Sequence, residues 1–370
     1  MRTHSVLAVV AGLCVLPLAA CSQGSSTSSS TTTNKDNASA SVGEAKGKAP
    51  APFDAGQVQI AIVQNSGQGD YFQQYLNGTK KQAEALKLKL DVYDAQGDNA
   101  QQATQLDQAI ASGAKGIIVR HGFPDTLCPG VNKAIDKGIK VVIYDVEIQK
   151  CAPRAVQTQQ SDAKMASLVL DQMVKDIGTG KPVGYVNVLG IAPLDRRDAV
   201  WKDYIAKNQW TQKFMTGKYT PSTATDTAPM VDNALKSNAD VVAIYAPYDE
   251  LTKATLSALG TNPNLKGKVK VYGADISTAD IELMSAPDSP WVATGATDPN
   301  AIGAAVVRTL ALHMAGTVKE GAKEDFPPIL VTSEMLRSKS IKNMDDLRKN
   351  APELNISKVS SADWIPAVTF

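Results

Sequence analysis

The sequence predicts an α/β protein with two Rossmann-like lobes built on parallel sheets. From Gln57 onward, short apolar runs alternate with segments whose apolar residues recur at helical spacing. The apolar runs are continuous, which is typical of parallel strands covered by helices on both faces. The alternation begins again after Asp162. The length and the pattern therefore fit two α/β units in tandem.

Residues 1–20 combine a short basic start with an apolar run that ends in small residues, which is the pattern of a secretory signal peptide. The run is short and a polar tract follows it, so a permanent membrane-spanning helix is the weaker interpretation. Leu18-Ala19-Ala20-Cys21 resembles a bacterial lipobox, in which the cysteine is lipidated and becomes the mature N-terminus. Acyl chains on Cys21 would hold the protein on the outer face of a membrane. An ordinary secretory peptide with a chance cysteine is the alternative.

Residues 22–56 are rich in Ser, Thr, Ala, Gly and Lys and nearly free of large apolar side chains. Such a segment buries too little apolar surface to offset the entropy of ordering. We therefore expect a disordered tether between the lipidated cysteine and the folded part.

The first unit is expected to alternate strands and helices. Asp98 and Asn99 are suited to cap a helix, and Gly113 stands where that helix would stop. The expected strands are 58–63, 88–93, 116–119 and 141–144, and the expected helices are 71–86, the one capped at 98–99, and 127–137.

The second unit repeats the pattern. Its expected strands are 183–189, 213–219, 241–244 and 269–272, and its expected helices are 163–177, 196–208, 228–237 and 250–259, with a further helix at 301–315. In open parallel sheets, ligands bind beyond the carboxyl ends of the strands, so two facing lobes would share one cleft there. The residues directly after the strands are therefore the candidates for function.

Several short motifs at these positions carry a family resemblance. They are Ile60-Ala61-Ile62-Val63, Asp70-Tyr71-Phe72, Asn77-Gly78, Asp94-Ala95-Gln96, Val142-Ile143-Tyr144-Asp145, Tyr248-Asp249-Glu250 and Tyr272-Gly273-Ala274-Asp275. In this order the chain resembles the type I periplasmic sugar-binding family, which includes ribose-binding proteins, from residue 57 to about residue 336.

The resemblance implies a three-crossing hinge between the lobes, with crossings near 158–160, 296–297 and 330–331. The N-terminal lobe would then comprise 57–158 plus 298–330, and the C-terminal lobe 159–297 plus 331–370. Family members close on their ligand like a clamp, and the closed form is what an importer would recognise.

Carboxylates after strands give the clearest site prediction. Asp145, Asp249 and Asp275 each follow an apolar strand, where a carboxylate can accept two hydrogen bonds from ligand hydroxyls. Asp249 stands immediately before a predicted helix, so a helix cap is the alternative for that residue.

The resemblance assigns further ligand contacts. Tyr71 and Phe72 match the aromatic pair that covers the apolar face of a sugar ring, with core packing as the alternative. Other expected contacts lie where this chain departs from the common family pattern: Gln159, Gln160, Tyr248 and Thr297. Arg197 is expected to match a family arginine in the loop before the helix that carries Trp201, with a solvated surface position as the alternative. These departures leave the identity and stereochemistry of the ligand open.

Composition excludes several functions. A net charge of +1 without basic blocks gives no support for nucleic-acid binding. The sequence has no nucleophile elbow, phosphate loop or dinucleotide fingerprint, so we expect no enzyme, no catalytic residues and no cofactor. Too few histidines and cysteines remain for a metal site. Cys128 and Cys151 are expected to pair in an oxidising compartment, with two separate buried thiols as the alternative.

Taken with the resemblance, these observations predict an extracytoplasmic, lipid-anchored, monomeric solute-binding protein. It would bind a small polar ligand, a sugar or polyol, and deliver it to the permease of an ABC importer. A ligand-sensing module that signals to a membrane partner, or binding of an amine or an amino-acid-like solute, are the alternatives. The carboxylates disfavour an anionic ligand.

Overall fold

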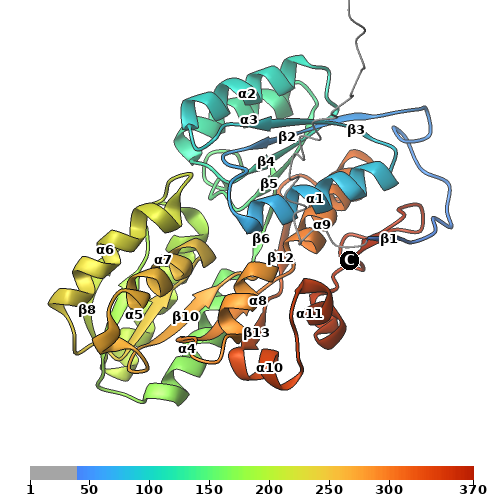
Figure 1. The fold of residues 1–370 in the computed structure, drawn as a ribbon. Coiled ribbons are helices and arrows are strands. Elements are labelled where there is room, and N and C mark those ends of the chain that lie inside the picture. The colour runs from blue at the N-terminus through green and yellow to red at the C-terminus, as the bar shows by residue number, and fades with distance from the viewer. Residues whose placement is uncertain (1–39) are drawn as a thin grey trace, which may run out of the picture. The chain divides into compact units, whose positions relative to one another are not determined.

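The computed structural model describes residues 40–370. Two six-stranded sheets, each with a core on both faces, form the two lobes seen in Figure 1. The predicted α/β class with two parallel-sheet lobes is confirmed. The signal peptide, the lipobox with Cys21 and residues 22–39 of the expected tether lie outside the described residues.

In the N-terminal lobe all paired strands are parallel. Ile60 and Ile62 pack with helices α1 and α9, whereas Ala61 and Val63 face α2 and α3. Because successive side chains enter opposite cores, the apolar run is continuous. The strand order is β12 (Lys323–Phe326), β6 (Val156–Gln160), β5 (Lys140–Tyr144), β4 (Gly116–Arg120), β2 (Gln59–Gln64) and β3 (Lys89–Asp94). The helices are α1 (Asp70–Ala85), α2 (Asn99–Ala111), α3 (Pro124–Asp136) and α9 (Pro299–Met314).

Helices α1 and α9 approach each other closely although they are far apart in the sequence. A Cβ atom on Gly78 would lie 1.9 Å from the Asn300 carbonyl oxygen, and one on Gly303 would lie 2.1 Å from that of Tyr75. Only glycine allows this approach. The contact holds the start of α1, which carries Tyr71 and Phe72, against the last helix of the lobe.

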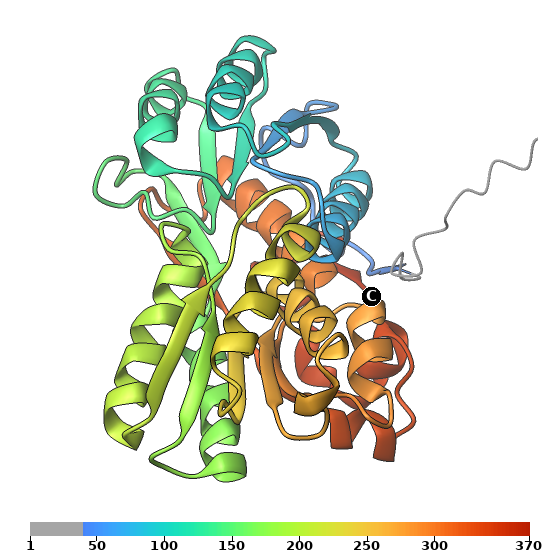
Figure 2. The ribbon, with the colours of Figure 1, turned by 60° about the vertical axis from the view of Figure 1, so that its left-hand side comes forward.

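The C-terminal lobe repeats this strand order, except that its last strand is antiparallel. Helices α4 and α5 pack on one face and α6 and α7 on the other (Figure 2). The strand order is β13 (Ile329–Thr332), β11 (Trp291–Ala296), β10 (Lys270–Ala274), β9 (Ala243–Ala246), β7 (Pro182–Val186) and β8 (Thr211–Thr216). The helices are α4 (Asp162–Ile177), α5 (Ala192–Asn208), α6 (Thr223–Ser237), α7 (Asp249–Gly260), α8 (Thr278–Ser285), α10 (Ser333–Ser338) and α11 (Met344–Asn350), with short 3₁₀ turns at Pro263–Leu265 and Pro352–Leu354.

The chain crosses between the sheets after β6, after β11 and between β12 and β13. Strand β6 ends at Gln160, within the range expected for the first crossing, whereas the third crossing lies between Phe326 and Ile329, just before the expected position. The expected assignment of residues 331–370 to the C-terminal lobe needs a larger correction. Helices α10 and α11 do pack there, but Ile356 joins the N-terminal core and Ile365 packs on α9.

Arg308 of α9 explains why the chain returns to the N-terminal lobe after α11. Its guanidinium is buried in the N-terminal lobe without a carboxylate partner among the described residues. It donates instead to the carbonyl oxygens of Ile356 (2.9 Å) and Val359 (3.1 Å) and to Gln82 Oε1 (3.1 Å). A buried guanidinium needs several acceptors. Residues 356–370 supply two of the three acceptors, and the segment that leads to them forms a fourth connection between the lobes.

The expected tether also needs a correction at its end. Residues 40–56 pack along residues 363–370, although little in their composition predicts it. Strand β1 (Ser41–Val42) pairs antiparallel with β14 (Val368–Thr369), and the rings of Phe53 and Trp364 lie 4.9 Å apart. Residues 40–56 are held by backbone hydrogen bonds to a segment that is remote in the sequence. Local composition cannot predict such contacts.

Cys128 and Cys151 are joined in the structure, with their Cα atoms 5.9 Å apart. That separation lies in the range that a disulfide requires. The oxidation state in the mature protein stays a prediction. None of the helices within residues 40–370 combines the length and the apolar character needed to cross a membrane.

Candidate ligand-binding site

Three residues that follow strands adopt left-handed turns at the edge of the sheets that faces the cleft. His121 follows β4, Asp145 follows β5 and Asp275 follows β10, with φ angles of 52°, 54° and 73°. Asp and His tolerate this conformation better than most residues do. Each backbone N–H still donates to a neighbouring strand: to Tyr144 O at 2.9 Å, Thr158 O at 3.1 Å and Gly295 O at 2.8 Å, respectively. The turn therefore redirects the side chain toward the carboxyl end of the sheet without loss of the ladder hydrogen bond.

A pocket of about 550 Å³, including the part that opens to solvent, lies between the lobes at this edge. Its polar lining comes from both lobes, and a group of apolar side chains lines the rest. The lining residues are Asn65, Tyr71, Phe72, His121, Gly122, Phe123, Gln160, Ile191, Pro193, Leu194, Arg197, Tyr219, Tyr248 and Asp275. A mixture of apolar side chains and a few polar groups from both lobes is typical of a site for a small ligand.

Buried charges lie next to the pocket in a network of alternating sign. Asp162 accepts from Arg196 Nε at 2.7 Å and from Arg197 Nε at 2.8 Å. Arg196 also reaches Asp145 at 2.6 Å, and an Arg197 nitrogen lies 3.7 Å from Asp275. The guanidiniums thus neutralise most of the carboxylate charge, which favours a ligand without net charge.

Asp145 and Asp275 each keep one oxygen to which no described residue donates a hydrogen bond, whereas both oxygens of Asp162 are bonded. These atoms are Asp145 Oδ2 and Asp275 Oδ1, and His121 Nδ1 shares this property. Burial, with Asp162 next in importance, raises the pKa of Asp145 to about 7, and burial raises the pKa of Asp275 to about 6 although Arg197 opposes it. Burial and the neighbouring arginines lower the pKa of His121, so that the ring is neutral. Buried acceptors without donors cost about 1–3 kcal/mol each, and ligand hydroxyls would satisfy them.

Tyr71, Phe72 and Tyr248 form an aromatic wall of the pocket, and Arg120 packs beneath its Phe72 ring. This guanidinium donates to Ser66 O at 2.5 Å and to Phe72 O at 3.0 Å, and it lies 5.0 Å from the Phe72 ring centre. It is fully buried beneath the wall rather than placed at the mouth of the cleft. Tyr71 is hydrogen-bonded through its hydroxyl to that of Tyr144. Arg120 therefore fixes the loop that presents Phe72 to the pocket.

The predicted contacts divide into two groups. Tyr71, Phe72, Gln160, Arg197, Tyr248 and Asp275 line the pocket, and Asp145 lies directly behind it against His121 and Arg196. Asp249 does not line it, because the start of α7 turns its carboxylate toward Lys253 (3.4 Å). Thr297 donates to Gln160 Oε1 at 2.7 Å and supports that residue from behind. Gln159 lies in β6 opposite Asp325 of β12, away from the pocket lining.

Several lining residues were not predicted. Ile191, Pro193 and Leu194 follow β7 and form the start of α5, Tyr219 follows β8, and Phe123 precedes α3. Their position after strands was the available signal, but apolar loop side chains suggest no particular chemistry. Asp162 was missed because the first residue of a helix is usually read as a cap.

A group of carboxylates outside the pocket has the spacing of metal ligands. Oxygen atoms of Asp70, Asp249 and Glu250 lie within 4.8 Å of one another. The ammonium group of Lys253 lies 2.8 Å from Asp70 and 2.9 Å from Glu250 and supplies positive charge there.

Comparison with known proteins identifies a family and individual proteins that this chain resembles. The sequence profile described as a periplasmic binding protein domain matches residues 60–317. The chain is 25% identical over 252 residues to the ribose import binding protein RbsB of Escherichia coli (strain K12), covering 68% of this chain and 82% of that protein.

Two solved structures are similar over most of their length. One is the 5-methylthioribose transporter solute binding protein from Thermotoga lettingae in complex with 5-methylthioribose, with a TM-score of 0.81 and 33% identity, covering 86% of this chain and 98% of that one. The other is a sugar ABC transporter protein from Yersinia enterocolitica, with a TM-score of 0.79 and 29% identity, covering 84% and 94%.

Proposed function

Because this chain belongs to the family of periplasmic binding protein domains, we propose that it captures a neutral sugar or polyol between its lobes and delivers it to an ABC importer. The relatives carry names of transport proteins: one is a ribose import binding protein and the other a 5-methylthioribose transporter solute binding protein. The family model supports the resemblance noted in the sequence over residues 60–317.

The observation that carries the proposal is the pair of buried carboxylates with free oxygens on opposite lobes. Asp145 belongs to the N-terminal lobe and Asp275 to the C-terminal lobe, and each keeps one oxygen without a donor. Asp275 lines the pocket, where a ligand hydroxyl could donate to it directly. Asp145 lies directly behind the lining, so a second hydroxyl would have to enter past His121 to donate to it. Since ligand contacts to both lobes are what favours closure, this arrangement suits capture by a clamp.

The lining favours a ligand that is polar at one end and apolar at the other. Part of the lining can form hydrogen bonds with a ligand, through Asp275, Arg197 and Gln160. Another part is apolar, with Phe123, Ile191 and Leu194, and would contact an apolar group of the ligand rather than its hydroxyls. A pentose with a small apolar substituent would use both. 5-Methylthioribose, the ligand of the similar Thermotoga lettingae protein, has this character and is our first candidate.

The same network supports binding over catalysis. Arg196 and Arg197 hold the carboxylates in ion pairs. No described residue forms a hydrogen bond with Nδ1 of the neutral His121, so this ring has no acid–base partner there. Carboxylates around a sugar are expected from hydrogen bonding alone. We propose that the protein acts without chemical turnover.

The location follows the family and the first residues of the sequence. We propose that the mature protein begins at lipidated Cys21, lies outside the cytoplasm and acts as a monomer. Mass spectrometry of the mature N-terminus tests the anchor, and an unmodified start or a start at another residue would refute it.

Calorimetric titration of the mature protein with 5-methylthioribose, ribose, ribitol and a set of amino acids tests the function. We expect saturable binding of at least one sugar or polyol, with 5-methylthioribose the tightest. A ligand at a hundred times its Kd should stabilise the protein by about 2.7 kcal/mol in a thermal-shift measurement. Binding of amino acids alone would overturn the ligand class and leave the fold unaffected.

A further inference from the structure

Lys253 of α7 lies at the centre of a cluster of four carboxylates outside the pocket. Its side chain is 16% exposed. The distances from Lys253 Nζ are 2.8 Å to Asp70, 2.9 Å to Glu250, 3.3 Å to Asp280 and 3.4 Å to Asp249. Burial raises the pKa of Asp249 and of Asp280, and their carboxylates raise the pKa of Lys253. The ammonium group is therefore charged at all ordinary pH values.

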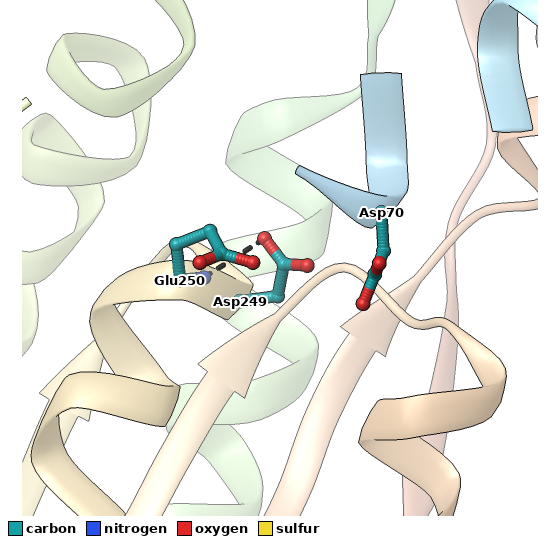
Figure 3. A group of neighbouring side chains, drawn as sticks. All are labelled: Asp70, Asp249 and Glu250. Atoms are coloured by element: carbon teal, nitrogen blue, oxygen red, sulfur yellow. Dashed lines mark hydrogen bonds between the residues drawn. The ribbon is translucent and has the colours of Figure 1, made fainter. Parts of the chain in front are cut away.

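The members of this cluster come from both lobes. Asp70 is the first residue of α1 in the N-terminal lobe, whereas Asp249, Glu250 and Asp280 belong to α7 and α8 in the C-terminal lobe. Figure 3 shows Asp70 opposite the two acids at the start of α7. Asp70 also accepts a hydrogen bond from Ser277 Oγ at 3.1 Å. The C-terminal lobe thus presents two donors to one carboxylate of the N-terminal lobe.

The cluster adjoins the aromatic part of the pocket along the chain. Asp70 directly precedes Tyr71 and Phe72, and Asp249 directly follows Tyr248. The rings of Phe72 and Tyr248 lie 6.5 Å apart across the cleft, and both line the pocket. The ion pair between Asp70 and Lys253 therefore fastens the two lobes at the outer edge of this aromatic wall.

We propose that Lys253 is a positioning residue for ligand retention, which acts through Asp70. The pair is a latch that touches no ligand and keeps Phe72 and Tyr248 together when the lobes close. The proposal rests on the ligand-binding function argued above. Lys253 retains its other carboxylates whether the lobes are open or closed, so only the contact with Asp70 reports closure.

Asp70→Asn is the sharpest test, because it removes the charge from the N-terminal partner and leaves the C-terminal cluster intact. For a partly exposed, charge-assisted contact we expect 5-methylthioribose, or ribose if that is the sugar bound, to dissociate about three- to tenfold faster in stopped-flow measurements. The association rate should change little. High salt should speed release from the wild type more than from the variant, because salt screens the ion pair.

Matched variants separate the latch from a general effect on folding. Asp125→Asn changes an exposed acid in the first turn of α3 in the same lobe and should leave release unchanged. Lys253→Arg should retain most of the slow release, whereas Lys253→Met should not. If Asp70→Asn and Asp125→Asn release the ligand at the same rate, the latch is refuted.

A second measurement needs no ligand. Spin labels on Gln108→Cys in α2 and Lys207→Cys in α5 report the distance between the lobes. With Asp70→Asn we expect a smaller fraction of short distances than in the wild type, and identical distributions would overturn the latch. Failure of the wild type to bind any sugar would instead count against the proposed function, so the two failures are distinguishable.

Discussion

The two lobes share a strand order but contribute different chemistry to the site. Arg120 of the N-terminal lobe and Arg197 of the C-terminal lobe are both fully buried beside the pocket. Arg120 is bonded to backbone carbonyls and lies against two aromatic rings, whereas Arg197 is paired with Asp162 and lies near Asp275. In one lobe the buried cation organises a loop, and in the other it balances carboxylates.

This difference suggests a division of labour. The N-terminal wall, with Phe72 above Arg120, sets the shape of the pocket, and the C-terminal wall, with Asp275 and Arg197, supplies most of its hydrogen-bonding strength. Asp145 is the exception, since it carries charge on the N-terminal side, yet its ion-pair partner Arg196 comes from the C-terminal lobe.

Replacement of Arg197 by methionine should have the largest effect. It leaves Asp275 without its buried cation and Asp162 with Arg196 alone. Loss of one partner of a buried ion pair typically costs about 3–5 kcal/mol. Arg120→Met should cost less, because no carboxylate depends on Arg120 among the described residues. Unfolding of both variants in urea measures the difference, and equal losses would show that the two arginines have the same role.

Asp275→Asn should come next, with a loss of ligand affinity of about a hundredfold. The amide keeps the size of the side chain but replaces an ionised acceptor, and hydrogen bonds to charged groups are worth about 1.5–3 kcal/mol. Calorimetric titration measures the loss. Asp240→Asn, which changes an acid exposed outside the pocket, serves as the control, and an unchanged Kd for Asp275→Asn would contradict the polar role of the C-terminal wall.

The affinity for the ligand should also decrease as the pH is lowered. Hydroxyls that donate to Asp145 and Asp275 favour the ionised forms and lower the pKa values of about 7 and about 6 that burial produces. Binding then releases protons, and a shift of one unit in the group near 7 weakens binding about tenfold between pH 8 and pH 5. Titrations across this range test the sign, and tighter binding at low pH would exclude ionised carboxylates as the acceptors.

The raised pKa values have the opposite effect on the ligand-free protein. Because the folded state favours the protonated carboxyls, the stability that they contribute is present at low pH and is lost as pH rises toward about 7. Asp145→Asn should remove the part of this dependence that belongs to Asp145, which thermal unfolding at several pH values would measure.

The smallest expected effect belongs to Phe72→Leu. Loss of part of an aromatic contact should weaken binding of the ligand found by calorimetric titration about fivefold, or about 1 kcal/mol. Phe214→Leu, a partly buried residue outside the pocket lining, is the matched control. If Phe72→Leu weakens binding more than Asp275→Asn does, the aromatic wall contributes more than shape.

Much of the fold could be predicted because buried parallel strands produce continuous apolar runs. The strands β2, β4 and β5 and the helices after them lie close to their expected bounds. Strands β6 and β12 escaped prediction because Gln and acidic residues dominate them. These two strands form through backbone hydrogen bonds with neighbouring strands near the edge of the sheet. Such pairing leaves no apolar pattern in the sequence.

The site was partly predictable for a related reason. Asp145 and Asp275 could be predicted because a carboxylate directly after a buried strand requires a cation or hydrogen-bond donors. Leu194 and Tyr219, in contrast, resemble ordinary loop residues. Asp249 matched the same rule as Asp275 but faces Lys253 instead of the pocket. Sequence position placed these carboxylates at the correct edge of the sheet, but tertiary geometry decided which of them line the pocket.

The return of residues 356–370 to the N-terminal lobe separates the order of synthesis from the order of folding. The lobe that begins with β2 needs Ile356 in its core and the carbonyl oxygens of Ile356 and Val359 for Arg308. Until those residues have emerged, a nascent chain holds a guanidinium that water must solvate. Export in an unfolded form would then be easier, because the first lobe is not complete while residues near 370 are still being made.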